Sequence, residues 1–410
     1  MKKKILLVVI LVLVAGSIWY LESIKAHPDA GGNGAPQAIN VGDGTTAIAT
    51  TTTTTIDVQG SNSPAAVRQS LATLAATDKA EGYEPAIEIA DPTGFVNVSS
   101  SFKLGSLIGK KVILLDFWTY SCINCIRTLP YLTAWYSRYA SSGLEIVGIH
   151  TPEFDFEKDI NNVIAATQKY GIKYPVVLDS NYGTWNAYGN QYWPHEYLID
   201  LAGYIVHDQV GEGNYDETEK KIQELLAERG QILGVQTAPT PSSTVTVASS
   251  TIAGGAISPE TYFGANRNEY LANGVQGRPG TQTFSIPASL YANALYLKGV
   301  WDVEPEFAQT PEGVSASAPD SVEYQYIAKG IYWVAGSANG SPIDVEVLRD
   351  GKPVAQSVAG SDIFYKNGHS YIEVTGDRLY RLVDDKAAGG HAIELIITSP
   401  GLQAYTFTFG

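Results

Sequence analysis

The sequence is short of cysteine and of positive charge. It has two cysteines in 410 residues, and 27 Lys and Arg residues stand against 42 Asp and Glu residues, a formal net charge of -15. Two cysteines exclude a zinc site built from four of them. The shortage of basic residues argues against a nucleic-acid partner, because nothing could neutralise a row of phosphates. Hydrophobic residues make up 44% of the chain, enough for substantial cores, and the length allows two or three domains.

Both cysteines lie in one stretch, Asp116 to Cys125. The apolar run Val112–Leu115 before it predicts a buried strand of a parallel sheet. The helical spacing of apolar residues over Ile126–Tyr139 predicts a helix that begins at or near Cys122. A helix N-terminus favours a thiolate at its first cysteine, and Cys125 lies one turn further in. The pattern predicts a redox pair at a strand–helix junction.

The motif around the cysteines resembles thioredoxin: Asp-Phe-Trp-x-x-x-Cys-x-x-Cys, with Pro130 five residues after the second cysteine. The longer stretches Trp118–Leu132 and Gly148–Phe154 resemble DipZ-type thiol–disulfide interchange proteins, of the TlpA/redoxin branch. Pro259–Gly264 and Gln403–Gly410 resemble the C-terminal, carbohydrate-module-like domain of the same family. These proteins usually carry a CcdA-like electron conduit in the same chain, whereas this sequence shows one candidate span and lacks such a module. The resemblance therefore implies a separate membrane partner.

The N-terminal residues 1–24 predict a membrane anchor. Lys2, Lys3 and Lys4 precede about 17 uncharged, mostly apolar residues, Ile5–Leu21. Basic residues on this side predict a cytoplasmic N-terminus and an extracytoplasmic remainder. A cleaved signal peptide, with a small-residue site at Ala15–Ser17 and a secreted product, is the alternative. Both alternatives place the cysteines where disulfide chemistry is permitted.

Two low-complexity segments divide the rest of the chain. Residues 25–80 are rich in Gly, Ala and Thr and predict a linker, with a short helix over Ala65–Ala76. Residues 233–258 predict a second linker, rich in Pro, Ser and Thr. Between them, residues 81–232 alternate strand and helix patterns, which predicts an α/β thioredoxin-like domain with both faces of its sheet covered.

Within residues 81–232, several elements are expected besides the redox helix. Ala86–Ile89 and Phe95–Val98 predict a leading hairpin turned by Pro92–Gly94. The remaining expected strands and helices are a strand at Leu144–Ile149, a helix over Phe156–Tyr170, strands at Val176–Leu178, Glu196–Asp200 and Tyr204–Val206, and a closing helix over Asp216–Arg229.

Residues 259–410 have a sequence pattern that predicts a different fold class. Short alternating segments punctuated by Gly, Pro and Asn predict an all-β jelly-roll sandwich, and Asp350-Gly351 is a hairpin signal. Its aromatic residues could stack on sugar rings, although a core role is the commoner one. They are Trp301, Tyr324, Tyr326, Tyr332 and Trp333.

We predict Cys122 as the nucleophile and Cys125 as the resolving thiol. No further cofactor is expected beyond the redox-active Cys122–Cys125 disulfide. A structural disulfide and half of a metal site are the alternatives. The resemblance makes Asp116 a buried carboxylate near Cys125, where burial would raise its pKa and let it exchange a proton with that thiol.

The resemblance also places a cis-proline at Pro194, facing the cysteines, so that the backbone of Trp193 is presented to a substrate peptide. His195 follows and is a candidate for tuning the thiolate. Gly211 fits the glycine that this fold brings close to the active site.

Other residues are candidates for the substrate-binding wall. Trp118, Tyr120 and Asn124 flank the cysteines, and Asn124 stands where thioredoxin has proline. His150 and Glu153 end a strand at the same edge of the sheet.

We predict a membrane-anchored, extracytoplasmic thiol–disulfide oxidoreductase. Its partners would be exported protein thiols and disulfides, a separate CcdA-like membrane electron donor or acceptor, and a glycan or protein ligand of the sandwich. The resemblance favours a reductant, with cytochrome c maturation as one setting. A peroxiredoxin-type peroxidase is an alternative, although the Pro-x-x-x-Thr pattern is absent before Cys122. The third alternative is a binding module whose disulfide is structural.

Overall fold

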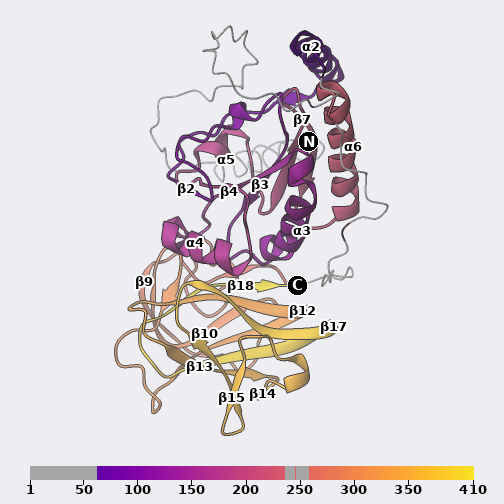
Figure 1. Ribbon diagram of the computed structural model, residues 1–410. Helices are drawn as coiled ribbons and strands as arrows, with labels where there is room; N and C mark the ends of the chain where they lie inside the picture. The colour runs from indigo at the N-terminus through magenta and orange to yellow at the C-terminus, as the bar shows by residue number, and fades with distance from the viewer. Residues whose placement is uncertain (1–61, 236–244, 246–257) are drawn as a thin grey trace, which may run out of the picture. The chain divides into compact units, whose positions relative to one another are not determined.

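The computed structural model describes residues 62–235, 245 and 258–410 (Figure 1). All of them belong to one compact unit, Ala38–Gly410. The candidate anchor Ile5–Leu21 and most of both predicted linkers lie outside the described residues. In the part of the chain that the structure describes, no helix is both long enough and apolar enough to cross a membrane.

Residues 84–210 build a seven-stranded mixed sheet around β3. Strand β3 is buried along its whole length, pairs in parallel with β4 and pairs antiparallel with β6. The strand order is β1-β7-β6-β3-β4-β5-β2. The strands are β1 (Glu84–Pro85), β2 (Gly94–Val96), β3 (Val112–Trp118), β4 (Leu144–His150), β5 (Val176–Leu178), β6 (His195–Ile199) and β7 (Tyr204–Val210).

Helices cover both faces of this sheet, as predicted. Leu114 of β3 belongs to the same apolar cluster as Leu129 of α3 and Leu225 of α6, whereas Leu115 belongs to a cluster with Trp185 of α5. The alternation follows from the two-residue period of a strand. The helices are α2 (Pro64–Glu81), α3 (Ile123–Tyr139), α4 (Ile160–Lys169), α5 (Gly183–Ala187) and α6 (Tyr215–Leu233). Figure 1 shows α3 and α6 side by side.

The predicted leading hairpin is wrong. Strand β1 pairs with β7, and β2 pairs with β5, so the two segments complete opposite edges of the sheet. The chain between them buries Ala86 and Ile89 in the cluster beneath β3. Pairing with an existing sheet edge satisfies more backbone groups than a hairpin of two short strands would.

One helix differs from expectation, and another is longer than expected. The helix expected over Phe156–Tyr170 is broken, because a 3₁₀ turn at Asp155–Lys158 precedes α4 and the Asp159 side chain accepts a 2.9 Å hydrogen bond from Asn161 N. Helix α2 confirms the short helix predicted over Ala65–Ala76 and extends beyond it at both ends, so the last part of the predicted 25–80 linker is helical. It is capped by Ser63 Oγ, and Asn62 Nδ2 donates to Gln231 O at 2.9 Å.

The C-terminal region is β-rich, as expected. Its eleven strands follow the order β15-β16-β13-β17-β12-β10-β11-β18-β8, with β9 on β10 and β14 on β13, and the further pairing of β12 with β18 closes part of the sheet into a ring. They are β8 (Thr261–Tyr262), β9 (Gly280–Phe284), β10 (Leu295–Val303), β11 (Ala308–Gln309), β12 (Asp320–Ser337), β13 (Ile343–Arg349), β14 (Lys352–Pro353), β15 (Phe364–Lys366), β16 (His369–Val374), β17 (Arg378–Ile397) and β18 (Leu402–Phe409).

The structure of this region confirms the predicted hairpin and buries the candidate sugar-binding residues. Asp350 and Gly351 have φ of 52° and 71° and join β13 to β14, so the hairpin signal is confirmed. The five aromatic candidates for sugar stacking are all buried, which leaves them no face for a sugar ring. Trp301, Tyr324 and Trp333 are at 0%, Tyr326 at 1% and Tyr332 at 4% exposure.

A contact that the sequence did not predict joins the β-rich region to the redox helix. One apolar cluster combines Ile123 and Ile126 of α3 with Tyr332 of β12 and Tyr405 of β18. Polar contacts flank it: Arg127 Nη2 donates to Tyr332 Oη at 3.1 Å. The N-terminus of α3, where the cysteines lie, is therefore covered by the C-terminal strands.

Candidate active site

Cys122 is the N-cap of α3, which confirms the predicted helix start. Its Sγ accepts a hydrogen bond from Cys125 N at 3.4 Å, and Ile126 N donates to Cys122 O at 3.0 Å. Both cysteines are free thiols, with Cys122 at 8% exposure and Cys125 at 1%. Burial, together with Cys122 and the charge of Asp116, raises the pKa of the Cys125 thiol well above its usual range. The two thiols thus differ in access, and the deeper one is held protonated by its surroundings.

The peptide bond between Trp193 and Pro194 is cis, as predicted. Cys122 Sγ lies 3.9 Å from Trp193 O, so this carbonyl accepts from the thiol. The indole of Trp193 is fixed by a 3.0 Å bond from its Nε1 to Thr151 O and packs on Trp185 with ring centroids 4.2 Å apart. The backbone before the proline is therefore held beside the more accessible cysteine.

Gly211 is hydrogen-bonded to the loop that holds the cis-proline, but no atom lies where its side chain would be. Its N donates to Pro194 O at 2.9 Å, and a Cβ built on it would meet nothing within 4 Å. The φ of 72° is what favours glycine at this position. The prediction that this position needs glycine to let another group approach closely is therefore wrong, and the backbone conformation is the reason instead.

His195 lies on the opposite face of the sheet from the cysteines. It pairs in register with Phe117 of β3, while the neighbouring position, Glu196, pairs with Asp116. Its Nδ1 contacts Asn190 Oδ1 at 2.5 Å, and its Nε2 lies 3.2 Å from Asp208 Oδ2. Burial lowers its pKa. The structure does not bring the His195 side chain to the thiols.

Asp116 and Glu196 form a buried pair of carboxyl groups that sequence analysis recognised only in part. They are 1% and 3% exposed. Neither oxygen of Asp116, nor Glu196 Oε2, has a hydrogen-bond partner among the described residues. Burial raises the pKa of Asp116 to about 8. Burial, then the charge of Asp116, raises the pKa of Glu196 well above its usual range. The sequence signal for this pair was Glu196 itself, an acidic residue within the strand that follows Pro194.

Asp116 shares this buried space with Cys125 and Tyr174. Burial is the main cause that raises the pKa of the Tyr174 hydroxyl, and the charges of Asp116, Glu196 and Cys125 raise it further. The same carboxyl charge of Asp116 also raises the pKa of the Cys125 thiol. A proton on this cluster is therefore energetically linked to the protonation of the resolving thiol.

Two of the three predicted wall residues are buried. Trp118 is 0% exposed and lies edge-on to His150, with centroids 5.2 Å apart. Tyr120 is 6% exposed and stacks on His150 at 5.6 Å. Burial lowers the pKa of His150 to about 3, so its ring is neutral. Asn124, by contrast, is half-buried and lines a cavity beside the cysteines.

Glu157 is a further residue that sequence analysis missed. It is fully buried and accepts hydrogen bonds from Ser121 N at 3.2 Å and Ser121 Oγ at 2.7 Å. Its other oxygen accepts from Glu153 N at 2.6 Å and Phe154 N at 3.1 Å. Burial raises its pKa to about 7. Glu157 thereby fixes the residue that precedes Cys122. The acidic run Asp155–Asp159 does not reveal which of its carboxylates turns inward.

Comparison with known proteins assigns both halves of the chain. The Redoxin family matches residues 95–226, and the family described as "Thioredoxin like C-terminal domain" matches residues 258–410. Protein DipZ of Mycobacterium tuberculosis and of Mycobacterium bovis is 39% identical over 320 residues, 78% of this chain and 42% of DipZ. Thiol-disulfide oxidoreductase YkuV of Bacillus subtilis is 30% identical over 122 residues, 30% of this chain and 82% of YkuV.

The chain therefore spans less than half the length of the DipZ proteins it matches. The matched residues include the strand, the helix and both cysteines described above. The chain is a DipZ homologue with a Redoxin domain and a thioredoxin-like C-terminal domain, and, like YkuV, it belongs to the thioredoxin-like thiol–disulfide oxidoreductases.

Proposed function

We propose that this chain exchanges disulfides with protein substrates through Cys122 and Cys125. The observation that supports this most directly is the position of Cys122. It caps α3, accepts the Cys125 N–H, and lies beside the carbonyl of Trp193 before the cis-proline. A thiol at a helix N-terminus, more exposed than a second thiol one turn deeper, is the arrangement that such exchange requires.

In the reducing direction, the Cys122 thiolate attacks one sulfur of a substrate disulfide. A Cys122–substrate bond forms, the substrate S–S bond breaks, and the leaving thiolate takes up a proton. Cys125, once deprotonated, then attacks Cys122 Sγ. The Cys122–Cys125 disulfide forms and the second substrate thiol is released. Two electrons pass from the protein dithiol to the substrate.

Asp116 is our candidate acceptor for the Cys125 proton. The Cys125 thiol is buried and its pKa is raised, so the second step needs a base inside the protein. The Asp116 carboxyl is buried, has no hydrogen-bond partner among the described residues, and has a pKa of about 8. Its charge already acts on Cys125, which supports proton exchange between the two, directly or through one water.

Trapping experiments test the roles of the two cysteines. A Cys125→Ser variant should accumulate a mixed disulfide with a cysteine-containing peptide, because the second step is blocked. Cys122→Ser, the matched control, should trap far less, since its remaining thiol is 1% exposed. Equal trapping by both variants, or by neither, would contradict the assignment. Mass spectrometry of the adduct identifies the cysteine involved.

We further propose that the protein is anchored by Ile5–Leu21 and acts outside the cytoplasm as a reductant, fed by a separate CcdA-like membrane partner. Lys2–Lys4 and the apolar run support this orientation. Cytochrome c maturation is one setting for such a reductant. A reduction potential near that of thioredoxin, about -270 mV, would support it, whereas one near DsbA, about -120 mV, would indicate an oxidant. Fractionation of cells that express the full chain tests the anchor.

For residues 259–410, we propose a jelly-roll-type sandwich that docks protein substrates. Its contact with the N-terminus of α3 supports a role close to the cysteines.

A further inference from the structure

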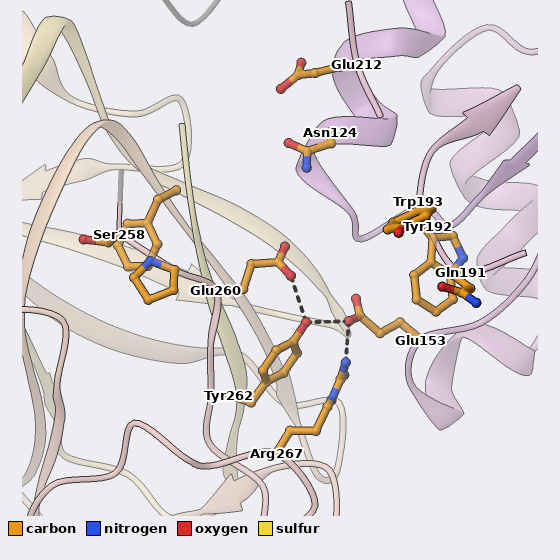
Figure 2. Close-up of a pocket in the computed structure, with 12 residues that line it drawn as sticks. Asn124, Glu153, Gln191, Tyr192, Trp193, Glu212, Ser258, Glu260, Tyr262 and Arg267 are labelled. Carbon is orange, nitrogen blue, oxygen red and sulfur yellow. Dashed lines mark hydrogen bonds and ion pairs between the residues drawn. The ribbon is translucent and has the colours of Figure 1, made fainter. Parts of the chain in front are cut away.

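A cavity of about 560 Å³ lies between the redox helix and the β-rich region (Figure 2). One wall carries Asn124, from between the two cysteines, with Tyr192 and Trp193 from the loop before the cis-proline. The other wall carries Glu260, Tyr262 and Arg267. A molecule in this cavity would therefore contact the residues that surround Cys122, whose Sγ lies 3.9 Å from Trp193 O.

A polar network crosses the cavity between its two walls. Arg267 Nη1 lies 3.0 Å from Glu153 Oε1, which also accepts from Tyr262 Oη at 2.7 Å. Tyr262 Oη lies 2.9 Å from Glu260 Oε2 as well. Figure 2 shows these three contacts converging on the tyrosine and on Glu153. A tyrosine hydroxyl has one hydrogen, so it can donate to only one of the two carboxylates at a time.

Glu260 is the carboxylate of this network that forms no ion pair, although the charge of Arg267 acts on it from a greater distance. Glu153 has Arg267, and Glu212, which also lines the cavity, has Arg127 Nη1 at 3.1 Å. Among the described residues, no Lys, Arg or His forms an ion pair with Glu260. Its side chain stays open to solvent, although protein surrounds it closely enough to raise its pKa to about 7. An incoming cation would make with Glu260 the close ion pair that no side chain among the described residues makes.

An exposed aromatic side chain lies at the same cavity. Tyr192 is 51% exposed, although most large hydrophobic residues of the described chain are buried. An exposed tyrosine next to a cleft is typical of surfaces that bind polypeptides. Its ring face also favours a cationic neighbour.

We propose that this cavity binds the polypeptide segment around the substrate cysteine, and that Glu260 pairs with a lysine or arginine side chain beside that cysteine. Glu260 and Tyr262 thus make the β-rich region one wall of the substrate site. The proposal rests on the proposed exchange at Cys122 and names the class of substrate that this exchange prefers.

Three synthetic peptides test the proposal. They share one sequence with a single cysteine blocked as a mixed disulfide with 2-mercaptoethanol, and they differ at one neighbouring position, which is Lys, Gln or Glu. The rate constant for oxidation of the reduced full chain is measured by thiol labelling. We expect the Lys peptide to react about tenfold faster than the Gln peptide, and the Glu peptide to react slowest.

Two matched variants separate a local ion pair from the general field of an acidic protein. Glu260→Gln and Glu312→Gln remove the same formal charge, but Glu312 is exposed and is not among the cavity residues. The Lys-to-Gln rate ratio should fall to near one in Glu260→Gln and stay at its wild-type value in Glu312→Gln. An equal fall in both variants would overturn the role of Glu260. If Glu260→Gln does not fold, the wild-type ratio measured against salt serves instead: a local pair keeps much of the ratio at about 0.15 M salt, whereas a ratio near one at that salt would assign the effect to the general field and overturn the role of Glu260.

The reaction of the wild-type protein with bis(2-hydroxyethyl) disulfide distinguishes the two proposals. If this neutral disulfide oxidises the cysteine pair while the three peptides react equally, the cavity proposal is overturned and the exchange function stands. If neither reagent oxidises the pair, the exchange function itself fails.

Discussion

Asp116 and Glu196 face each other across β3 and β6 as directly paired residues, and both carboxyl groups are buried on the face of the sheet that holds Cys125. Like-charged groups in a dry site cannot both ionise without a large cost, so at neutral pH the pair holds protons. This pair lies beneath the redox site and should govern both the stability of the protein and its second chemical step.

The first prediction concerns how stability depends on pH. Asp116 has a pKa of about 8 when folded and an ordinary value of 3.8, so between these pH values the folded protein keeps a proton that the unfolded chain releases. Stability should therefore fall as pH rises through this window. Each retained proton contributes a slope of about 1.4 kcal/mol per pH unit. Asp116→Asn and Glu196→Gln should each flatten the curve by about that amount.

Urea unfolding at several pH values between 5 and 7.5 measures these slopes. The double variant should lose about twice the slope of either single one, and Asp116→Asn should be more stable than wild type near pH 7.5 but not near pH 4. Glu312→Gln is the control, because an exposed glutamate should leave the slope unchanged. An unchanged slope in Asp116→Asn would show that this carboxyl is ionised in the folded protein.

The second prediction concerns resolution of the mixed disulfide. With Asp116 as the base for Cys125, the rate of release should rise with pH through about 8, as the carboxyl ionises. Asp116→Asn should slow release by about 10²-fold and remove this ionisation from the profile. Single-turnover release of a peptide from the Cys122 adduct measures it. The same rate and the same profile in both proteins would exclude Asp116 as the base.

The features that sequence analysis predicted correctly are local ones. The start of α3 at Cys122 follows from a buried strand followed by helical spacing, and the motif around it carries the resemblance that predicted the cis bond at Pro194. The burial of β3 likewise follows from its run of apolar residues. Each depends on neighbours within a few residues.

The features that were missed depend on distant partners. The role of Glu196 depends on its pairing with Asp116 in the neighbouring strand. Ile123 is buried by strands that lie near the end of the chain. Glu157 turns inward because amide groups of two separate loops need an acceptor. The hairpin prediction was wrong for the same reason, since β1 and β2 each pair with a strand at opposite edges of the sheet.

The third prediction concerns Glu157. Replacing it with Ala leaves the amides of Ser121, Glu153 and Phe154 without their acceptor in a buried site. We expect a loss of about 3–5 kcal/mol of unfolding free energy. Glu157→Gln should cost less, because one oxygen remains to accept from one of the two loops. Chemical denaturation of both variants measures this, and a loss below about 0.5 kcal/mol, the range of surface substitutions, would mean that water replaces the carboxylate.

The fourth prediction concerns the cover that the C-terminal strands provide over the redox helix. Tyr405 of β18 is 5% exposed, and its ring lies 5.1 Å from that of Phe154 and 4.9 Å from that of Phe156. It shares an apolar cluster with Ile123, which stands between the two cysteines. Tyr405→Ala should therefore open the surroundings of α3, raise the alkylation rate of Cys122 several-fold, and cost about 3–5 kcal/mol of stability.

Tyr291→Ala is the matched control for this variant, because Tyr291 belongs to the same β-rich region but is 77% exposed. It should change neither stability nor alkylation. Limited iodoacetamide labelling followed by mass spectrometry reports the two thiols separately, and Cys125, at 1% exposure, should stay protected in both variants. If Tyr405→Ala lost the expected stability but left the Cys122 rate unchanged, the C-terminal strands would support the fold without limiting access to the nucleophile. A raised rate at Cys122 alone would instead show that the β-rich region limits access to the nucleophile.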